Sequence, residues 1–141
     1  MHIKEFKPQR IRFPIPTREL ERRWALVQEA MKKEGIDSLV MQNDNQWLGG
    51  YVRYFTDLPS EQAYPYSVIF PANDEMTVIS SGPYAPAPPP NWACRGIKEK
   101  IGLPYFRAFH YTNNMDAEAI VNVLKRRNDK RVGLINLGYI P

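Results

Sequence analysis

The sequence predicts an α/β fold in which a mixed β-sheet is flanked by helices. Residues 18–34 and 115–127 each carry apolar side chains at the spacing of one helical face. Short apolar runs have the length of buried strands, at residues 37–42, 66–70, 76–80, 105–111 and 131–137. Helices beside four or five such strands bury their apolar faces by packing in layers, which predicts a single α/β domain.

The first helix is expected at residues 18–34, with Thr17 as its N-cap. Its apolar face comprises Leu20, Trp24, Val27 and Met31, so Trp24 is interpreted as a core residue. Gly35 follows as a C-terminal stop, because glycine readily adopts the left-handed conformation that ends helices. The prolines of "KPQRIRFPIP" remove backbone donors and disfavour helix, so residues 1–16 are expected to form an extended arm.

The middle of the chain predicts a β-hairpin, since residues 66–70 and 76–80 flank the turn-rich "PANDE". The five prolines of residues 82–91 indicate a polyproline-like surface loop. Further on, the strand at 105–111, the helix at 115–127 and the strand at 131–137 predict a right-handed βαβ unit. The helix is expected to bury Ala117, Ile120, Val121 and Leu124.

Composition excludes several classes of protein. A chain of 141 residues has room for one full domain. Cys94 is the single cysteine, which excludes an internal disulfide or a cysteine-based zinc site and favours a cytoplasmic location. The charged N-terminus is unlike a signal peptide, and no apolar run approaches the roughly 20 residues that span a bilayer, so no membrane partner is expected.

The net charge of +4 is divided between the two ends of the chain. Residues 1–35 and 95–141 each carry nine Lys and Arg, whereas residues 36–94 carry only Arg53 against six acidic residues. A nucleic-acid-binding domain usually gathers its basic side chains on one face. This division favours ordinary solvated helix faces, and no nucleic-acid partner is expected.

Catalytic and metal-binding motifs are missing from the sequence. The two histidines, His2 and His110, lie far from each other in sequence and lack carboxylates at ligand spacing. No HExxH, P-loop, GxGxxG or GxSxG motif occurs. The sequence therefore predicts no catalytic residue, no metal ligand and no cofactor in this chain.

The stretch "NDNQWLGGYVRYFTDLP" at residues 43–59 is unusually rich in aromatic and polar side chains for a loop. Packing is favoured over ligand contact for Trp47, Tyr51 and Phe55. Arg53 and Asp57 are harder to explain as core residues, because buried charges require partners.

The order of these elements resembles the N-terminal domain of the creatinase, aminopeptidase P and prolidase family, the "pita-bread" metallohydrolases. The resemblance rests on "RELERRWALVQEAMKKEGIDSLVM", on "NDNQWLGGYVRYFTDL", on the hairpin "YSVIF…MTVIS" and on the closing "KRVGLINLGYI". It covers nearly the whole chain. It implies a ribonuclease H-like mixed sheet at residues 17–141, which in the family continues through another helix and strand.

The resemblance also implies that the chemistry lies outside this chain. In the family, a larger C-terminal domain supplies the aspartate, histidine and glutamate ligands, usually of two divalent metals, so Mn, Co or Zn is expected there. The N-terminal domain helps to form homodimers and walls the active-site cleft. The residues expected on that wall are Trp47, Arg53, Tyr54, Asp57, Gln62 and Tyr64. The positions of Gln62 and Tyr64 do not keep the residue types of creatinase, which favours a peptidase-like relative.

These observations leave alternative functions open. The first hypothesis is a non-catalytic domain of an Xaa-Pro peptidase-like hydrolase, with a homodimer formed through apolar surface that includes Trp92. The second is a stand-alone module that binds a small ligand through the aromatic loop at residues 43–66. A basic nucleic-acid-associated domain is the third and weakest.

Overall fold

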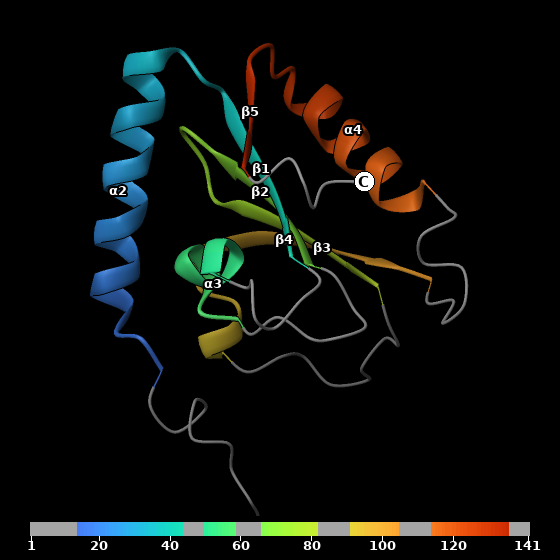
Figure 1. Cartoon of the computed structure of the whole chain (residues 1–141). Coiled ribbons are helices and arrows are strands. Elements are labelled where there is room, and N and C mark those ends of the chain that lie inside the picture. The colour runs from blue at the N-terminus through green and yellow to red at the C-terminus, as the bar shows by residue number, and fades with distance from the viewer. Residues whose placement is uncertain (1–13, 44–49, 59–65, 82–90, 105–113, 136–141) are drawn as a thin grey trace, which may run out of the picture.

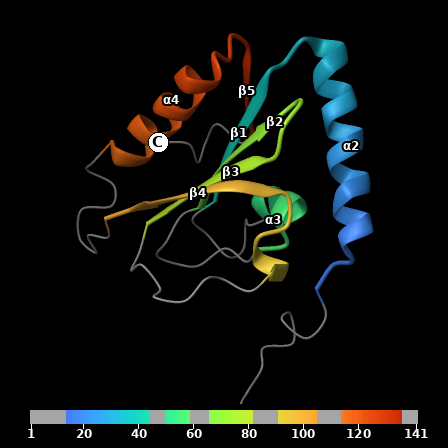
Figure 2. The same ribbon diagram turned by 180° about the vertical axis from the view of Figure 1, so that it is seen from behind.

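The computed structural model describes residues 14–43, 50–58, 66–81, 91–104 and 114–135. In these residues a five-stranded mixed sheet carries helices on both faces (Figure 1). Helices α2 (Thr17–Glu34) and α3 (Gly50–Thr56) lie on one face, and α4 (Met115–Arg127) lies on the other, as the reverse view also shows (Figure 2). The predicted α/β class is confirmed.

The sheet has the strand order β4-β3-β2-β1-β5. Its strands are β1 (Ser38–Asn43), β2 (Tyr66–Pro71), β3 (Met76–Ser81), β4 (Ile97–Leu103) and β5 (Val132–Ile135). The hairpin of β2 and β3 is antiparallel, as predicted, and β2 also pairs antiparallel with β1. The outer pairs, β1 with β5 and β3 with β4, are parallel.

Alternation along the strands produces two apolar layers. On the face of α2 and α3, Met41, Val68 and Phe70 pack with helix residues Met31 and Phe55. On the opposite face, β-strand residues pack against α4. Since successive side chains of a strand point to opposite faces, each central strand contributes to both layers. The core therefore lies on both sides of the sheet, and the central strands β1, β2 and β3 are mostly apolar.

Helix α2 matches its prediction except at its first residue. Gly35 ends it with φ 65°, and its apolar face buries Leu20 and Met31. Thr17, however, is the first helical residue and makes no capping hydrogen bond. Pro16 takes the cap position, and its carbonyl accepts the N–H groups of Glu19 and Leu20. The Thr17 hydroxyl instead lies 3.5 Å from Arg95 Nη1.

Strand β4 was not predicted from the sequence. Its segment "IKEKIGL" alternates partly buried and exposed side chains, with Lys98 and Lys100 exposed. Charged side chains are common in edge strands, where they discourage pairing with other chains. They also interrupt the continuous apolar run that marks a central strand in a sequence, and for that reason this segment was missed. The strand predicted at 105–111 and the proline loop at 82–91 lie outside the described residues, except for Asn91.

The first strand of the predicted βαβ unit, at 105–111, lies outside the described residues, and α4 followed by β5 is the part of the unit that the structure describes. Among the described strands, β4 and β5 form the two edges of the sheet. The buried face of α4 agrees with the prediction in part, because Ile120 is buried and Leu124 packs against the same cluster. The helix also buries Val123, whereas Val121 is 44% exposed.

The joint between α2 and β1 is fixed by Asp37. Its carboxylate accepts the N–H groups of Lys130 and Arg131 at 2.7 and 2.9 Å, just before β5 begins. These two hydrogen bonds lower the pKa of Asp37, and the one from Arg131 has the larger effect. The backbone of Asp37 also pairs with Arg131 and Ala72. The Gly-Ile-Asp junction thus aligns both neighbours of β1 in the sheet.

Candidate functional site

Part of the stretch at 43–59 is helical, and the prediction of a loop is wrong there. Helix α3 buries Val52 and Phe55 against the sheet, where the Phe55 ring lies 4.6 Å from that of Phe70 between centroids. The expected packing is therefore found for Phe55. Tyr51, by contrast, is 46% exposed. The helix was missed because seven residues make barely two turns, too few for a periodic pattern.

The outer side of α3 presents predicted site residues to solvent. Arg53 is exposed, and Tyr54 is 40% exposed. The guanidinium of Arg23, from α2, lies 4.8 Å from the centroid of the Tyr54 ring and donates to the Tyr54 carbonyl at 3.2 Å. This cation–π contact orients the ring. The predicted residues Trp47, Gln62 and Tyr64 lie outside the described residues.

Asp57 belongs to an ion pair that holds Ile15, just before α2. Its side chain is 2% exposed, and its Oδ2 accepts both the N–H of Ile15 at 2.9 Å and Nη2 of Arg95 at 3.0 Å. Arg95 also donates to the carbonyls of Ile15 and, at 3.0 Å, Trp92. We call Asp57, Arg95 and Ile15 the arm clamp. The arm clamp binds both the N–H and the carbonyl of Ile15. Its carboxylate is that of Asp57, which the family resemblance led us to expect on the wall of an active-site cleft.

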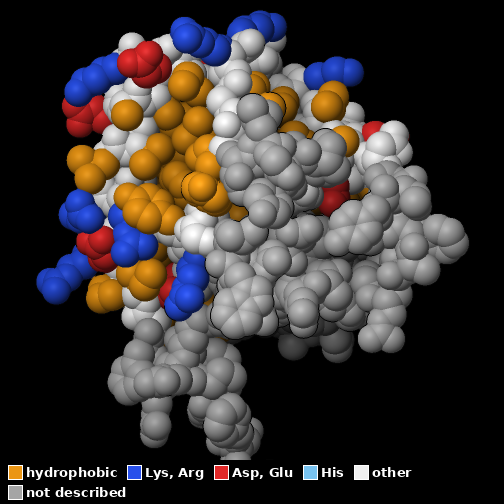
Figure 3. Space-filling model, in the orientation of Figure 1, with side chains coloured by type: hydrophobic (Ala, Val, Ile, Leu, Met, Phe, Trp, Pro, Cys, Tyr) orange, Lys and Arg blue, Asp and Glu red, His pale blue; other side chains and the backbone are white. Residues whose placement is uncertain are grey.

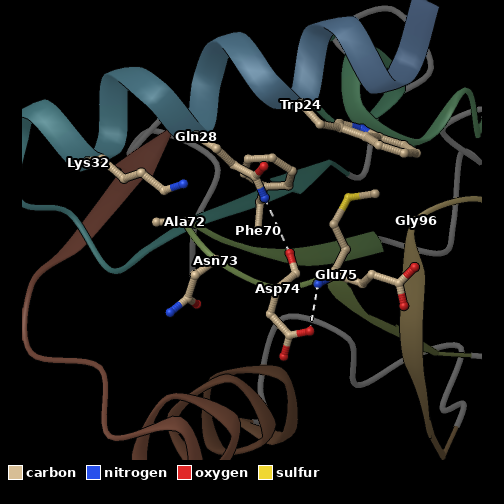
Figure 4. A pocket seen from close by; sticks show the side chains of 10 residues that line it. Trp24, Gln28, Lys32, Phe70, Ala72, Asn73, Asp74, Glu75 and Gly96 are labelled. Atoms are coloured by element: carbon tan, nitrogen blue, oxygen red, sulfur yellow. Dashed lines mark hydrogen bonds between the residues drawn. The ribbon is translucent and has the colours of Figure 1, made fainter. Parts of the chain in front are cut away.

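A groove of about 430 Å³ lies between α2 and the turn from β2 to β3. Figure 4 shows Trp24, Gln28 and Lys32 along its helical wall and Asp74 and Glu75 on the turn opposite. Its remaining lining residues include Phe70, Met76 and Gly96. We call it the α2 groove.

Hydrogen bonds fix the walls of the α2 groove. Trp24 donates through its indole nitrogen to the Phe55 carbonyl at 2.8 Å, which joins the groove to α3. Gln28 donates to the carbonyls of Pro71 and Asp74 at 3.1 and 3.4 Å. The helix and the turn are therefore tied together, and the groove between them has a defined width.

The charges in the α2 groove differ in their partners. The pKa of Asp74 is lowered to about 2, mainly by a hydrogen bond that Lys98 donates to its carboxylate at 2.9 Å. Nη1 of Arg127 also lies 3.2 Å from the same carboxylate oxygen. Asp74 is thus ionised and already compensated. Within the described residues, the side chains of Lys32 and Glu75 make no hydrogen bond or ion pair. These two charges are available to a ligand.

Sequence reasoning missed Arg95, Lys32 and Glu75. Lys32 continues the series of Trp24 and Gln28 at four-residue spacing, so a helical wheel could have placed the three together. Nothing in sequence relates Lys32 to Glu75, because the contact between α2 and the hairpin turn is made only in the fold.

Acidic and basic side chains alternate on the face shown in Figure 3, along the edge where α2 lies. Within α2, Arg22 forms an ion pair with Glu19 and Lys33 forms one with Glu29. Glu19 has its pKa lowered to about 2 by hydrogen bonds from Arg22 and Arg23. This face presents mixed charge and no single basic patch.

The described residues contain no group of three or more His, Cys, Asp or Glu side chains that could hold a metal ion. None of the helices in this part of the chain is long and apolar enough to cross a membrane.

Comparison with known proteins gives a likeness of fold. No family model matches the chain, and no curated protein matches it either. The aminopeptidase P (Xaa-Pro aminopeptidase) of Streptococcus thermophilus is similar over 85% of this chain and 79% of that chain, with 14% identity and a TM-score of 0.51. The dipeptidase PepE of Mycobacterium ulcerans matches 46% of this chain and 16% of that chain, at 21% identity and a TM-score of 0.36. The first match shows that this chain has an aminopeptidase P-like α/β fold.

Proposed function

We propose that this chain is a non-catalytic domain of a hydrolase related to the Xaa-Pro peptidases, in which it walls the active-site cleft. The observation that carries the proposal is the aminopeptidase P-like fold, matched over 85% of the chain. Its partner is a catalytic domain that supplies the metal ligands, since the described residues offer no such group. The exposed side of α3, with Arg53 and Tyr54, is the part of the wall that contacts substrate.

The chain alone is expected to show no turnover of Xaa-Pro dipeptides or tripeptides when Mn²⁺ or Co²⁺ is added. A catalytic pair of metals needs several clustered carboxylate and imidazole ligands, and two dispersed histidines cannot supply them. Measuring release of the N-terminal amino acid from both kinds of substrate by the purified chain tests this. Turnover that survives purification and disappears with a chelator would contradict the proposal.

The reading frame around the coding sequence separates the two leading functions. Codons after Pro141 that encode a segment with the Asp, Asp, His, Glu, Glu pattern of the pita-bread hydrolases would support the hydrolase domain. A stop codon there would support the stand-alone binding module instead, with the stretch at 43–66 as its ligand site.

Self-association is part of the same proposal. We expect a two-fold homodimer, because a closed, self-complementary interface is the commonest way to cover an apolar patch. Trp92, which is partly buried beside the arm clamp, is the described residue of the proposed patch. Light scattering over a concentration series tests this, and the Trp92→Glu variant should weaken the dimer while the fold is retained. A mass of 16.4 kDa at every concentration would contradict it.

A further inference from the structure

We propose that the α2 groove binds a short linear peptide of about three residues, with free termini and an apolar central side chain. The inference uses only the residues of this groove and does not depend on the proposed role as a hydrolase domain.

The first argument is the placement of charge. Lys32 and Glu75 stand at opposite ends of the groove, with Gln28 and Phe70 between them (Figure 4). Neither side chain has a partner within the described residues, whereas Asp74 is compensated by Lys98 and Arg127. A ligand that matches this pattern carries a carboxylate at one end and an ammonium group at the other.

The second argument is length. Trp24, Gln28 and Lys32 follow one another at four-residue spacing, so the groove runs along roughly 12 Å of helix at 1.5 Å per residue. An extended peptide spans about 3.3–3.6 Å per residue. About three residues therefore fit along this length of the groove, with the ammonium group toward Glu75 and the carboxylate toward Lys32.

The third argument is the apolar floor. Phe70 lies between the charges, Met76 also lines the groove, and the partly buried ring of Trp24 forms its wall on the side of Glu75. The Trp24 ring is held by its hydrogen bond to Phe55 and by contact with Gly96. The volume of about 430 Å³ lies in the usual range of small-ligand sites. The middle side chain of the peptide is therefore apolar.

The probe is the tripeptide Gly-Leu-Gly, titrated into the isotope-labelled chain while amide and indole N–H signals are followed by NMR. We expect weak, saturable shifts at Glu75, Gly96 and the Trp24 indole. Acetylating the amino terminus or amidating the carboxyl terminus should each weaken binding roughly two- to fivefold, the range of one exposed ion pair.

Charge-removing variants assign each terminus to its residue. Glu75→Gln should bind the free and acetylated peptides equally, and Lys32→Gln should bind the free and amidated peptides equally. Lys33→Gln is the matched control, because Lys33 is on the same helix but pairs with Glu29 and does not line the groove. It should keep both preferences.

Three outcomes would overturn the proposal. They are equal binding of free and doubly capped peptides to the unmodified chain, saturating shifts that lie outside the groove, and shifts that never saturate. Within the described residues neither tested side chain makes a hydrogen bond or ion pair, so unfolding of the variants is not expected. Unchanged melting curves would verify that any loss of binding is local.

Discussion

The Asp57→Ala substitution is expected to lower the free energy of unfolding by about 3 kcal/mol, the low end for removing one partner of a buried ion pair. Asp57 is 2% exposed and Arg95 is 13% exposed, so the guanidinium would be left largely buried with its charge uncompensated. The N–H of Ile15 would also lose its acceptor. Urea denaturation followed by tryptophan fluorescence measures the change.

Two further variants separate the causes of this loss. Asp57 has φ 59°, a left-handed conformation that asparagine and glycine tolerate better than alanine. Asp57→Gly relieves the backbone but removes the carboxylate, so it should remain strongly destabilised. Asp57→Asn keeps an acceptor for Ile15 and should lose less. An unfolding midpoint of Asp57→Gly close to that of the unmodified chain would show that backbone conformation, and not the arm clamp, controls stability here.

A double-mutant cycle tests the pair directly. Arg95→Met should be destabilising alone, because it leaves Asp57 buried without its cation. Combined with Asp57→Asn, it should cost less than the sum of the two single changes, since the double variant buries no unpaired charge. Additive changes would mean that the two side chains act independently.

The Gly96→Ala substitution is expected to destabilise the domain by about 2–4 kcal/mol, from overpacking and left-handed strain together. A Cβ at Gly96 would lie 2.5 Å from Cη2 of Trp24, and φ is 64°. The ring cannot move aside without losing its hydrogen bond from Nε1 to the Phe55 carbonyl. The same change should abolish peptide binding in the α2 groove, because Gly96 and Trp24 form its end.

Glycine positions elsewhere provide matched controls for Gly96. A Cβ at Gly50 meets no atom within 4 Å, so Gly50→Ala in α3 should be neutral or stabilising by roughly 0.5–1 kcal/mol. At Gly133 the added Cβ lies 2.6 Å from the flexible end of Leu39 and at ordinary contact distance from Ile36, so the cost should be intermediate. Thermal melts of the three variants give the order. An equal cost at Gly96 and Gly50 would contradict a fixed Trp24 ring.

Local pattern was sufficient for the elements whose signal is periodic or continuous. Helix α2 was predicted to within one residue, because it is long, has one apolar face and ends at Gly35. The hairpin of β2 and β3 was predicted because its strands are buried on both faces and read as apolar runs. Helix α4 was placed correctly and its buried face in part, since Ile120 and Leu124 pack in the core, but Val123 is buried instead of Val121, which is equally apolar in sequence.

Elements with weak local signals were decided by the tertiary structure. Strand β4 reads as a charged segment, and only pairing with β3 makes it a strand. Helix α3 is too short for periodicity and is stabilised by burying Val52 and Phe55. Their formation depends on contacts with residues distant in sequence, which no local pattern encodes.

The sequence by itself determined the α/β class, the order of most elements and the absence of recognised catalytic motifs. It also drew attention to Arg53, Tyr54 and Asp57, but not to what surrounds them. Only the tertiary structure joined Asp57 to Arg95, 38 residues later, and set Lys32 across a groove from Glu75. The physical reason is that two charges compensate each other according to their distance in space. Folding brings together charged groups that lie far apart along the chain, and their separation in sequence does not predict their distance in the fold.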